Sequence, residues 1–222
     1  MLDTFKILIV IDKFKGSLTS SQACLAIKKG IEKRWVDLFP SCNLSIEVLP
    51  MADGGEGTLE VIEKNVGGIK HYASVSDPLY REIKVPFLLK NKTAFIEMAL
   101  CSGLQLLTKD EYNPMITSTF GLGELILEAV RRGAEDIVVG IGGSATNDGG
   151  MGMLKALGYE FFDRRGDEAL SLNEVYEISD FNVSQSLHKV KFTVACDVTN
   201  PLLGDKGASI IYQNNILPFF KK

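Results

Sequence analysis

Three glycine-containing loops bring together the residue types that phosphoryl transfer requires. They read DKFKGS at residues 12–17, ADGGEGT at 52–58 and GGSATNDGG at 142–150. Each is expected to follow a strand and to lead into a helix. Glycines let a backbone approach a ligand closely, and helix N-termini favour anions. Carboxylates for Mg²⁺ or for a hydroxyl proton, and a lysine for developing charge, complete the parts of a phosphoryl-transfer site.

The third loop fits no common nucleotide-binding signature, and taken alone it favours a structural turn. It lacks the Gly-Lys-Ser/Thr of a P-loop and the spacing G-x-G-x-x-G, so a nicotinamide or flavin enzyme is disfavoured. Asp148 could cap the following helix, and Asn147 could form an Asx-turn. Asp53 and Glu56 would repel a bare phosphate, but a metal ion would reverse the sign of the local field. The three loops together therefore favour a site that contains a metal ion.

Further candidate residues stand at the ends of two later apolar runs. Cys196 and Asp197 directly follow the apolar run FTVA at 192–195, and Asn200 comes shortly after them. Cys196 is expected to be a buried structural thiol, because no base stands at a recognisable spacing. Glu97 ends the run TAFIE, where it is either an edge-strand charge or a pocket acid; the residues leave both alternatives open.

The elements that would position these loops begin with a βα-βα rhythm. Residues 6–11 read as a buried strand, 20–36 as a helix with a Thr19–Gln22 capping box, and 44–49 as a second strand. A helix follows ADGGEGT and ends at Gly67-Gly68. This rhythm predicts a parallel sheet, in which ligands gather at the carboxyl ends of the strands.

From residue 69 the rhythm changes to a β-rich segment, which marks a candidate second domain. Short strands are expected at 70–76, 83–89 and 93–98, with turns at Asp77-Pro78 and Asn91-Lys92. The later expected elements are a helix at 119–132, a strand at 136–140, a short helix at 150–157, and strands at 159–163 and 190–196.

Composition narrows the class of protein. The net charge of −4 argues against a nucleic-acid binder. The four cysteines are not at metal-site spacing and only two histidines are present, so a structural zinc site is not expected and the thiols should be reduced and buried. The apolar run at 7–11 is too short for a signal peptide, and no run is long enough to span a bilayer. A soluble, cytoplasmic protein is expected.

Several motifs resemble those of bacterial glycerate kinases. IDKFKGS resembles that family's D-S-F-K-G-S, with Lys13 where Ser is usual, and LPMADGGEGT matches its second signature. IEMALCSGL, NPMITSTFGLGELI, GIGGSATNDGGMGML and ACDVTNPLLGDKGAS are also similar to family motifs. The resemblance runs from about Ile7 to about Ser209, in order along almost the whole chain.

The resemblance implies an α/β kinase of two domains. A discontinuous Rossmann-like domain would have its N-terminal part at 1–68, and a mixed α/β domain inserted into it would occupy 69–222. The implied reaction is ATP plus D-glycerate to ADP plus 2-phosphoglycerate, with Mg²⁺, and a homo-oligomer is compatible with it.

Motif by motif, the resemblance also implies the cleft residues and their roles. Lys15 would stabilise phosphoryl charge, while Asp53 or Asp197 would orient the substrate hydroxyl. The expected catalytic residues are Asp12, Lys15, Asp53 and Asp197, with Asp53, Asp148 and Asp197 as candidate Mg²⁺ ligands. The expected substrate- or nucleotide-binding residues are Ser17, Gly54, Gly55, Glu56, Thr58, Glu97, Gly142, Gly143, Ser144, Asn147, Asp148 and Asn200.

The resemblance ends at about Tyr212, whereas family members continue. The expectation is that the C-terminal completion of the first domain is missing here, which would expose apolar faces and unpaired strand edges. Low stability, or an oligomer that covers the gap, would follow. The alternative function is a non-catalytic remnant that binds only glycerate or nucleotide.

Overall fold

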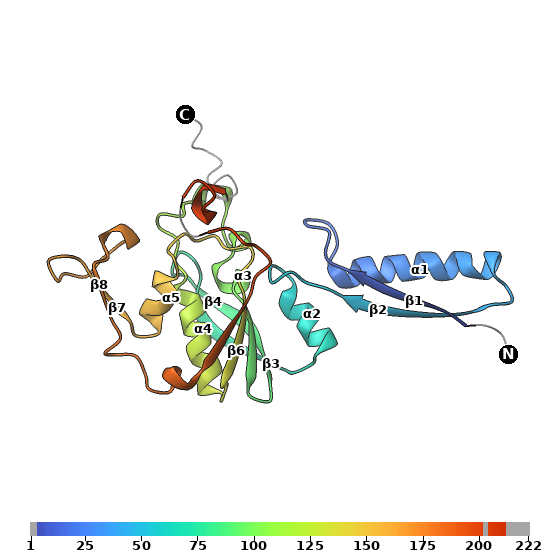
Figure 1. Cartoon of the computed structure of the whole chain (residues 1–222), viewed down its shortest axis with the longest axis horizontal. Coiled ribbons are helices and arrows are strands. Elements are labelled where there is room, and N and C mark those ends of the chain that lie inside the picture. Colours follow the sequence, from blue (N-terminus) through green and yellow to red (C-terminus); the bar gives the residue numbers. More distant parts are fainter. Residues whose placement is uncertain (1–3, 202–203, 212–222) are drawn as a thin grey trace. The chain divides into compact units, whose positions relative to one another are not determined.

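The computed structural model describes residues 4–201 and 204–211, which form two compact units (Figure 1). The first unit contains residues up to 53 and residues 57–67, and the second contains residues 54–56 and those from 68 onward. Over these described residues the chain is an α/β protein with a parallel sheet, a mixed sheet and a small two-stranded antiparallel sheet. The predicted domain boundary at 68/69 stays a prediction.

The first unit is a parallel strand pair with two helices. Its elements are β1 (Thr4–Ile11), α1 (Ser20–Leu38), β2 (Asn43–Pro50) and α2 (Thr58–Asn65). β1 and β2 pair in parallel from Thr4 opposite Asn43 to Ile11 opposite Pro50, which confirms the predicted βα-βα rhythm. Parallel neighbours need a crossover connection, and α1 supplies it.

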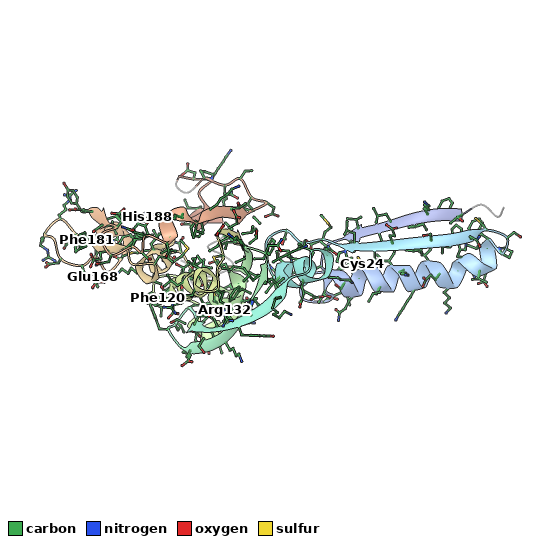
Figure 2. The ribbon with its side chains drawn as sticks, turned by 90° about the horizontal axis from the view of Figure 1, so that it is seen from below. Cys24, Phe120, Arg132, Glu168, Phe181 and His188 are labelled. Carbon is green, nitrogen blue, oxygen red and sulfur yellow. The ribbon has the colours of Figure 1, made fainter. Side chains whose placement is uncertain are left out.

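Helix α1 begins where the sequence predicts. The Thr19 hydroxyl accepts from Gln22 N, and Gln22 Oε1 accepts from Thr19 N, so the predicted capping box is present. Cys24 is fully buried on α1, toward the strands (Figure 2). The Ser20 hydroxyl donates to Ile11 O and accepts from Met51 N, which ties the helix start to the carboxyl ends of both strands.

The prediction that residues 6–11 form a buried strand is wrong in its burial. Only Ile9 of β1 is buried, whereas Leu8 and Val10 are exposed. The reason is that α1 covers one face of this two-stranded sheet, and alternate side chains of a strand point to opposite faces.

The second unit is built on a five-stranded mixed sheet. Its strands are β3 (Ile69–Ser76), β4 (Glu82–Lys90), β5 (Thr93–Glu97), β6 (Asp136–Gly140) and β9 (Lys191–Ala195), in that spatial order. The first three pair antiparallel and the last three parallel. The predicted turn at Asn91-Lys92 joins β4 to β5, with Asn91 in the left-handed region.

One face of this sheet packs against α4 (Phe120–Arg131), with α5 (Met151–Ala156) beside that helix. Phe120 and Arg132 mark the two ends of α4 in Figure 2. A Cβ at Gly121 would stand 1.8 Å from Ser76 O, so only glycine allows this approach of helix to strand. The core contains Phe87, Leu125 and Ile137, each fully or almost fully buried.

Several short elements were not predicted from the sequence. They are α3 (Ala99–Ser102), β8 (Glu177–Ser179), which pairs antiparallel with β7 (Glu160–Phe162), and the 3-10 helices Leu104–Leu106, Lys109–Glu111, Leu172–Glu174 and Leu187–Lys189. None of the helices within residues 4–201 and 204–211 is long and apolar enough to cross a membrane.

Candidate active site

In the first unit, Lys13 joins two of the predicted catalytic carboxylates. Its ammonium nitrogen donates to Asp53 Oδ1 at 3.0 Å and lies 3.8 Å from Asp12 Oδ1. Asp12 Oδ1 also accepts from Lys13 N. The lysine side chain is only 19% exposed, so this contact is partly shielded from water. Two acids that stand 41 positions apart in the chain therefore converge on one cation.

The sequence reading did not assign a role to Lys13. The signal was present, because Lys13 is the one position of IDKFKGS that departs from the family pattern to which the loop is similar. The other loop candidates lie differently. Lys15 and Ser17 are exposed on a tight turn that Phe14 and Leu18 close, and Thr58 is buried at the start of α2.

In the second unit, Gly54 and Gly55 pack against the carboxyl ends of β6 and β9. Gly54 O accepts from Gly142 N at 3.0 Å, and a Cβ on Gly54 would stand 2.5 Å from Ala195 O. A Cβ on Gly142 would lie 2.6 Å from Gly55 Cα. The glycines of two separate motifs are thus required by backbone-to-backbone contact, whereas Glu56 beside them is exposed.

The loop between β6 and α5 is held in place along its length (Figure 1). Gly143 O accepts from Leu104 N, Ala145 N donates to Ser102 O, and Ala145 O accepts from the Thr117 hydroxyl. Ser144 Oγ lies 2.7 Å from Thr146 Oγ1 and accepts from Thr146 N. The loop is therefore a fixed surface rather than a flexible turn.

The Asp148 carboxylate connects this loop by hydrogen bonds to the starts of α4 and α5. Its Oδ2 accepts from Thr119 N, the Thr119 hydroxyl and Gly152 N, and its Oδ1 accepts from Gly150 N, all at 2.8 to 3.1 Å. The Thr119 hydroxyl in turn accepts from Met153 N. The capping interpretation of Asp148 thus has direct support, since both oxygens already accept from protein donors.

Glu97 lies in the interior of the sheet, so it is not an edge-strand charge. It ends β5, which pairs with β4 on one side and β6 on the other, and it stands opposite Gly140. The residue is 2% exposed. Burial inside the sheet therefore excludes the edge-strand alternative, and the pocket-acid alternative stays a prediction.

The segment after β9 carries the remaining candidates, and it is exposed. Asp197 lies in solvent, Asn200 donates to Lys206 O, and Asn147 Oδ1 accepts from the Ser209 hydroxyl. The expectation that Cys196 is buried is wrong: it is exposed, because it follows an edge strand that no further element covers among the described residues. Cys24 and Cys101 are buried as expected, and burial raises the pKa of the Cys101 thiol to about 12.

Each unit therefore gathers its own subset of the predicted residues. The first brings Asp12 and Asp53 together around Lys13. The second brings Gly54, Gly55, Glu97 and the loop at 140–150 together at the carboxyl ends of β5, β6 and β9. Within the part of the chain that the structure describes, no three His, Cys, Asp or Glu side chains are grouped to hold a metal ion. Mg²⁺ bound with a nucleotide needs only one or two carboxylates besides phosphate oxygens, so a single carboxylate such as that of Asp53 would suffice as its protein ligand.

Comparison with known proteins places these motifs in one family. The model of the glycerate kinase family matches residues 7–215. The glycerate 2-kinase of Escherichia coli (strain K12) is 43% identical over 213 residues, which cover 93% of this chain and 54% of that protein. The glycerate kinase of Bacillus subtilis (strain 168) is 42% identical, with 93% and 54% covered.

A solved structure agrees with this likeness. The crystal structure of a Salmonella typhimurium LT2 protein assigned as glycerate kinase 2 matches with a TM-score of 0.77 and 36% identity, over 96% of this chain and 57% of that one. The chain thus spans about half the length of the curated relatives that it matches.

Proposed function

Because the chain belongs to the glycerate kinase family, we propose that it phosphorylates D-glycerate with ATP to give 2-phosphoglycerate and ADP. The observation that carries the proposal is the backbone contact between the DGG motif at residues 53–55 and the GIGG motif at residues 140–143. Gly54 O accepts from Gly142 N, and both glycines lie at the carboxyl ends of parallel strands. Open α/β sheets bind their ligands at such ends.

The first unit would supply the acid and the charge for transfer. Asp53 would orient the attacking hydroxyl of glycerate, with Asp197 of the second unit as the alternative, and the exposed Lys15 would stabilise charge on the moving phosphoryl group. Lys13 donates to Asp53 Oδ1, so this bond fixes the orientation of the carboxylate that would accept the proton.

The second unit would supply a rigid binding surface. Its loop at 140–150 would present backbone groups of Gly142 and Gly143 and the Ser144 hydroxyl to the substrate or nucleotide, with Glu97 behind them. Asp197 and Asn200, in the exposed segment after β9, would complete the set.

Mg²⁺ would enter with ATP. It would neutralise charge on the phosphate oxygens, and Asp53 or Asp197 would hold it. Asp148 is the weakest of the three candidates, because both of its oxygens already accept from protein donors.

We also propose the domain assignment that the resemblance implies. Residues 1–68 would be the N-terminal part of a Rossmann-like domain, and 69–222 would be a second, mixed α/β domain. The parallel pair of β1 and β2 and the mixed sheet from β3 to β9 support this division.

A second candidate function is binding without turnover. The observation that favours it is that the chain spans about half the length of its relatives, so groups that the longer enzymes use need not all be present. Such a chain would bind glycerate or nucleotide but release no ADP.

Two measurements on the purified chain separate these functions. A coupled assay follows ADP release with ATP, Mg²⁺ and D-glycerate, and calorimetry follows glycerate binding in parallel. Turnover that Asp53→Asn abolishes supports the kinase, with Asp37→Asn on exposed α1 as the matched control. Glycerate binding without turnover supports the second function. If the chain shows no binding and no turnover, the proposed function is contradicted. If Asp53→Asn leaves kcat unchanged, the proposed role of Asp53 is contradicted.

A further inference from the structure

The ammonium group of Lys13 is held beside two carboxylates at the carboxyl ends of β1 and β2. Its Nζ lies 3.0 Å from Asp53 Oδ1 and 3.8 Å from Asp12 Oδ1. The backbone nitrogen of Lys13 also donates to Asp12 Oδ1, at 2.6 Å. One residue therefore contacts the same Asp12 oxygen with its main chain and its side chain, and contacts Asp53 with that side chain as well.

The chain just before each carboxylate is fixed by hydrogen bonds. The last residues of β1 and β2 are partners in the pairing register, and Ile11 O accepts from Met51 N at 3.0 Å. The Ser20 hydroxyl donates to Ile11 O and accepts from Met51 N. Asp12 and Asp53 therefore extend from two strand ends that are bonded to each other and to the start of α1.

Partial burial strengthens the effect of the lysine on the two acids. The Lys13 side chain is 19% exposed, whereas the side chains of Asp12 and Asp53 are 40% and 41% exposed. A charge that is partly shielded from water interacts more strongly with its neighbours than one that is fully solvated. The protein itself thus compensates one of the two negative charges at this place.

A divalent cation at these carboxylates would have to approach the ammonium group. Mg²⁺ binds carboxylate oxygens at about 2.0–2.1 Å, so a metal ion on Asp53 Oδ1 would lie within about 5 Å of Lys13 Nζ. Like charges at this separation repel, and the metal ion would compete with Nζ for the same oxygen. Because Mg²⁺ also gives up its water ligands reluctantly, this repulsion should weaken its binding.

We propose that Lys13 is a tethered cation that lowers the affinity of Asp12 and Asp53 for free divalent metal ions. The ammonium group supplies part of the positive charge that a metal ion would otherwise bring, and it holds the Asp53 carboxylate in place without one. Only the consequence for catalysis rests on the proposed function: Mg²⁺ would then reach Asp53 together with ATP, because phosphate oxygens offset the ammonium charge.

The test is a titration of the purified full chain with Mn²⁺ alone, in which EPR measures the free ion. Mn²⁺ prefers the same oxygen ligands as Mg²⁺. Lys13→Met removes the charge but keeps a side chain of similar length, so Mn²⁺ should bind about tenfold more tightly than it binds to the parent. Lys13→Gln keeps an N–H donor without the charge and should have the same effect, whereas Lys13→Arg keeps the charge and should stay within about twofold of the parent.

Lys28→Met is the matched control. It removes one positive charge from α1 in the same unit, where Lys28 lies 3.8 Å from Glu32, and it should change the Mn²⁺ affinity by less than about twofold. Lys13→Met combined with Asp53→Asn should lose the gain in affinity, because the gain requires that carboxylate. The fluorescence of Trp35, on α1, reports whether the first unit stays folded in each variant.

A Mn²⁺ affinity that neither Lys13→Met nor Lys13→Gln raises overturns the proposal; if one of these variants unfolds the first unit, the other decides. An equal gain in Lys28→Met overturns it too, since net charge alone would then explain the effect, and so does a gain that survives Asp53→Asn. The titration contains neither ATP nor D-glycerate. A chain that shows the expected gain but makes no 2-phosphoglycerate would therefore contradict only the proposed function.

Discussion

Removal of the Asp148 carboxylate should destabilise the second unit more than removal of an ordinary exposed acid. Asp148→Ala deletes the acceptor for four hydrogen bonds, from Thr119 N, the Thr119 hydroxyl, Gly150 N and Gly152 N. Thr119 is 5% exposed, so its two donors would be left without water to replace the carboxylate.

The size of the effect follows from these contacts. A hydrogen bond to a charged group contributes about 1.5–3 kcal/mol, but such values are not additive, and Gly150 is partly exposed whereas Gly152 is buried. We therefore expect Asp148→Ala to lower the free energy of unfolding by about 3 kcal/mol. Thr119→Val should cost about 1–2 kcal/mol, and Thr119→Ser should restore most of it, because serine keeps the hydroxyl.

Urea unfolding followed by far-UV circular dichroism measures this loss. The single tryptophan, Trp35, lies on α1, so its fluorescence reports separately on the first unit. Asp180→Ala, at an exposed acid of the second unit, is the control and should stay within about 0.5 kcal/mol of the parent. The reasoning is refuted if Asp148→Ala is no more costly than Asp180→Ala, or if Asp148→Ala and Thr119→Val add without coupling in a double-mutant cycle.

Three further predictions concern backbone fit, thiols and pH. Gly54→Ala should lower the melting temperature more than Gly57→Ala does, because both positions have a positive φ but only the first would bring a Cβ to 2.5 Å from Ala195 O. Equal decreases in melting temperature would contradict the close-approach argument. Cys196 should react with Ellman's reagent at pH 8 well before Cys101, whose thiol is buried with its pKa raised to about 12, and Cys196→Ser should remove the fast phase. The pKa of Glu111 is lowered by the hydrogen bond from the backbone of Thr108 and by Arg81, so its contribution to stability is present above the ordinary pKa of a glutamate and is lost on acidification. Glu111→Gln should therefore make the free energy of unfolding fall less steeply with decreasing pH below about pH 4.5. An unchanged pH dependence in this acid range would contradict the argument.

The regular elements could be predicted from the sequence because local patterns determine them. The Thr19–Gln22 capping box sets the start of α1, and helical spacing of apolar residues predicts the helix as far as residue 36, close to its end at Leu38. The run at 136–140 became β6 with the predicted bounds. The motifs also correctly placed the candidate loops at the carboxyl ends of strands.

Features that depend on neighbours distant in the chain could not be predicted in this way. The burial of Glu97 follows from the order of strands, which puts β5 inside the sheet, and the exposure of Cys196 follows from β9 being at its edge. The exposure of Leu8 follows from α1 covering one face only. Periodicity carries no information on which strand is central or which face receives a helix.

The site was predictable as a set of residues and not as a set of contacts. The role of Lys13 needs a contact with Asp53, which stands 40 residues away. The glycines of two motifs interlock through Gly54 O and Gly142 N, and no local rule pairs them. The sequence allows Asp148 to be a helix cap or a metal ligand, and the four hydrogen bonds that its carboxylate accepts favour the cap.

Phosphoryl transfer itself is the most direct test of the account. The purified chain is incubated with ATP, Mg²⁺ and D-glycerate, and ³¹P NMR identifies the product. The account predicts 2-phosphoglycerate, with loss of product in Asp53→Asn and its retention in Asp37→Asn. A chain that forms no phosphorylated glycerate and binds neither D-glycerate nor ATP would contradict it.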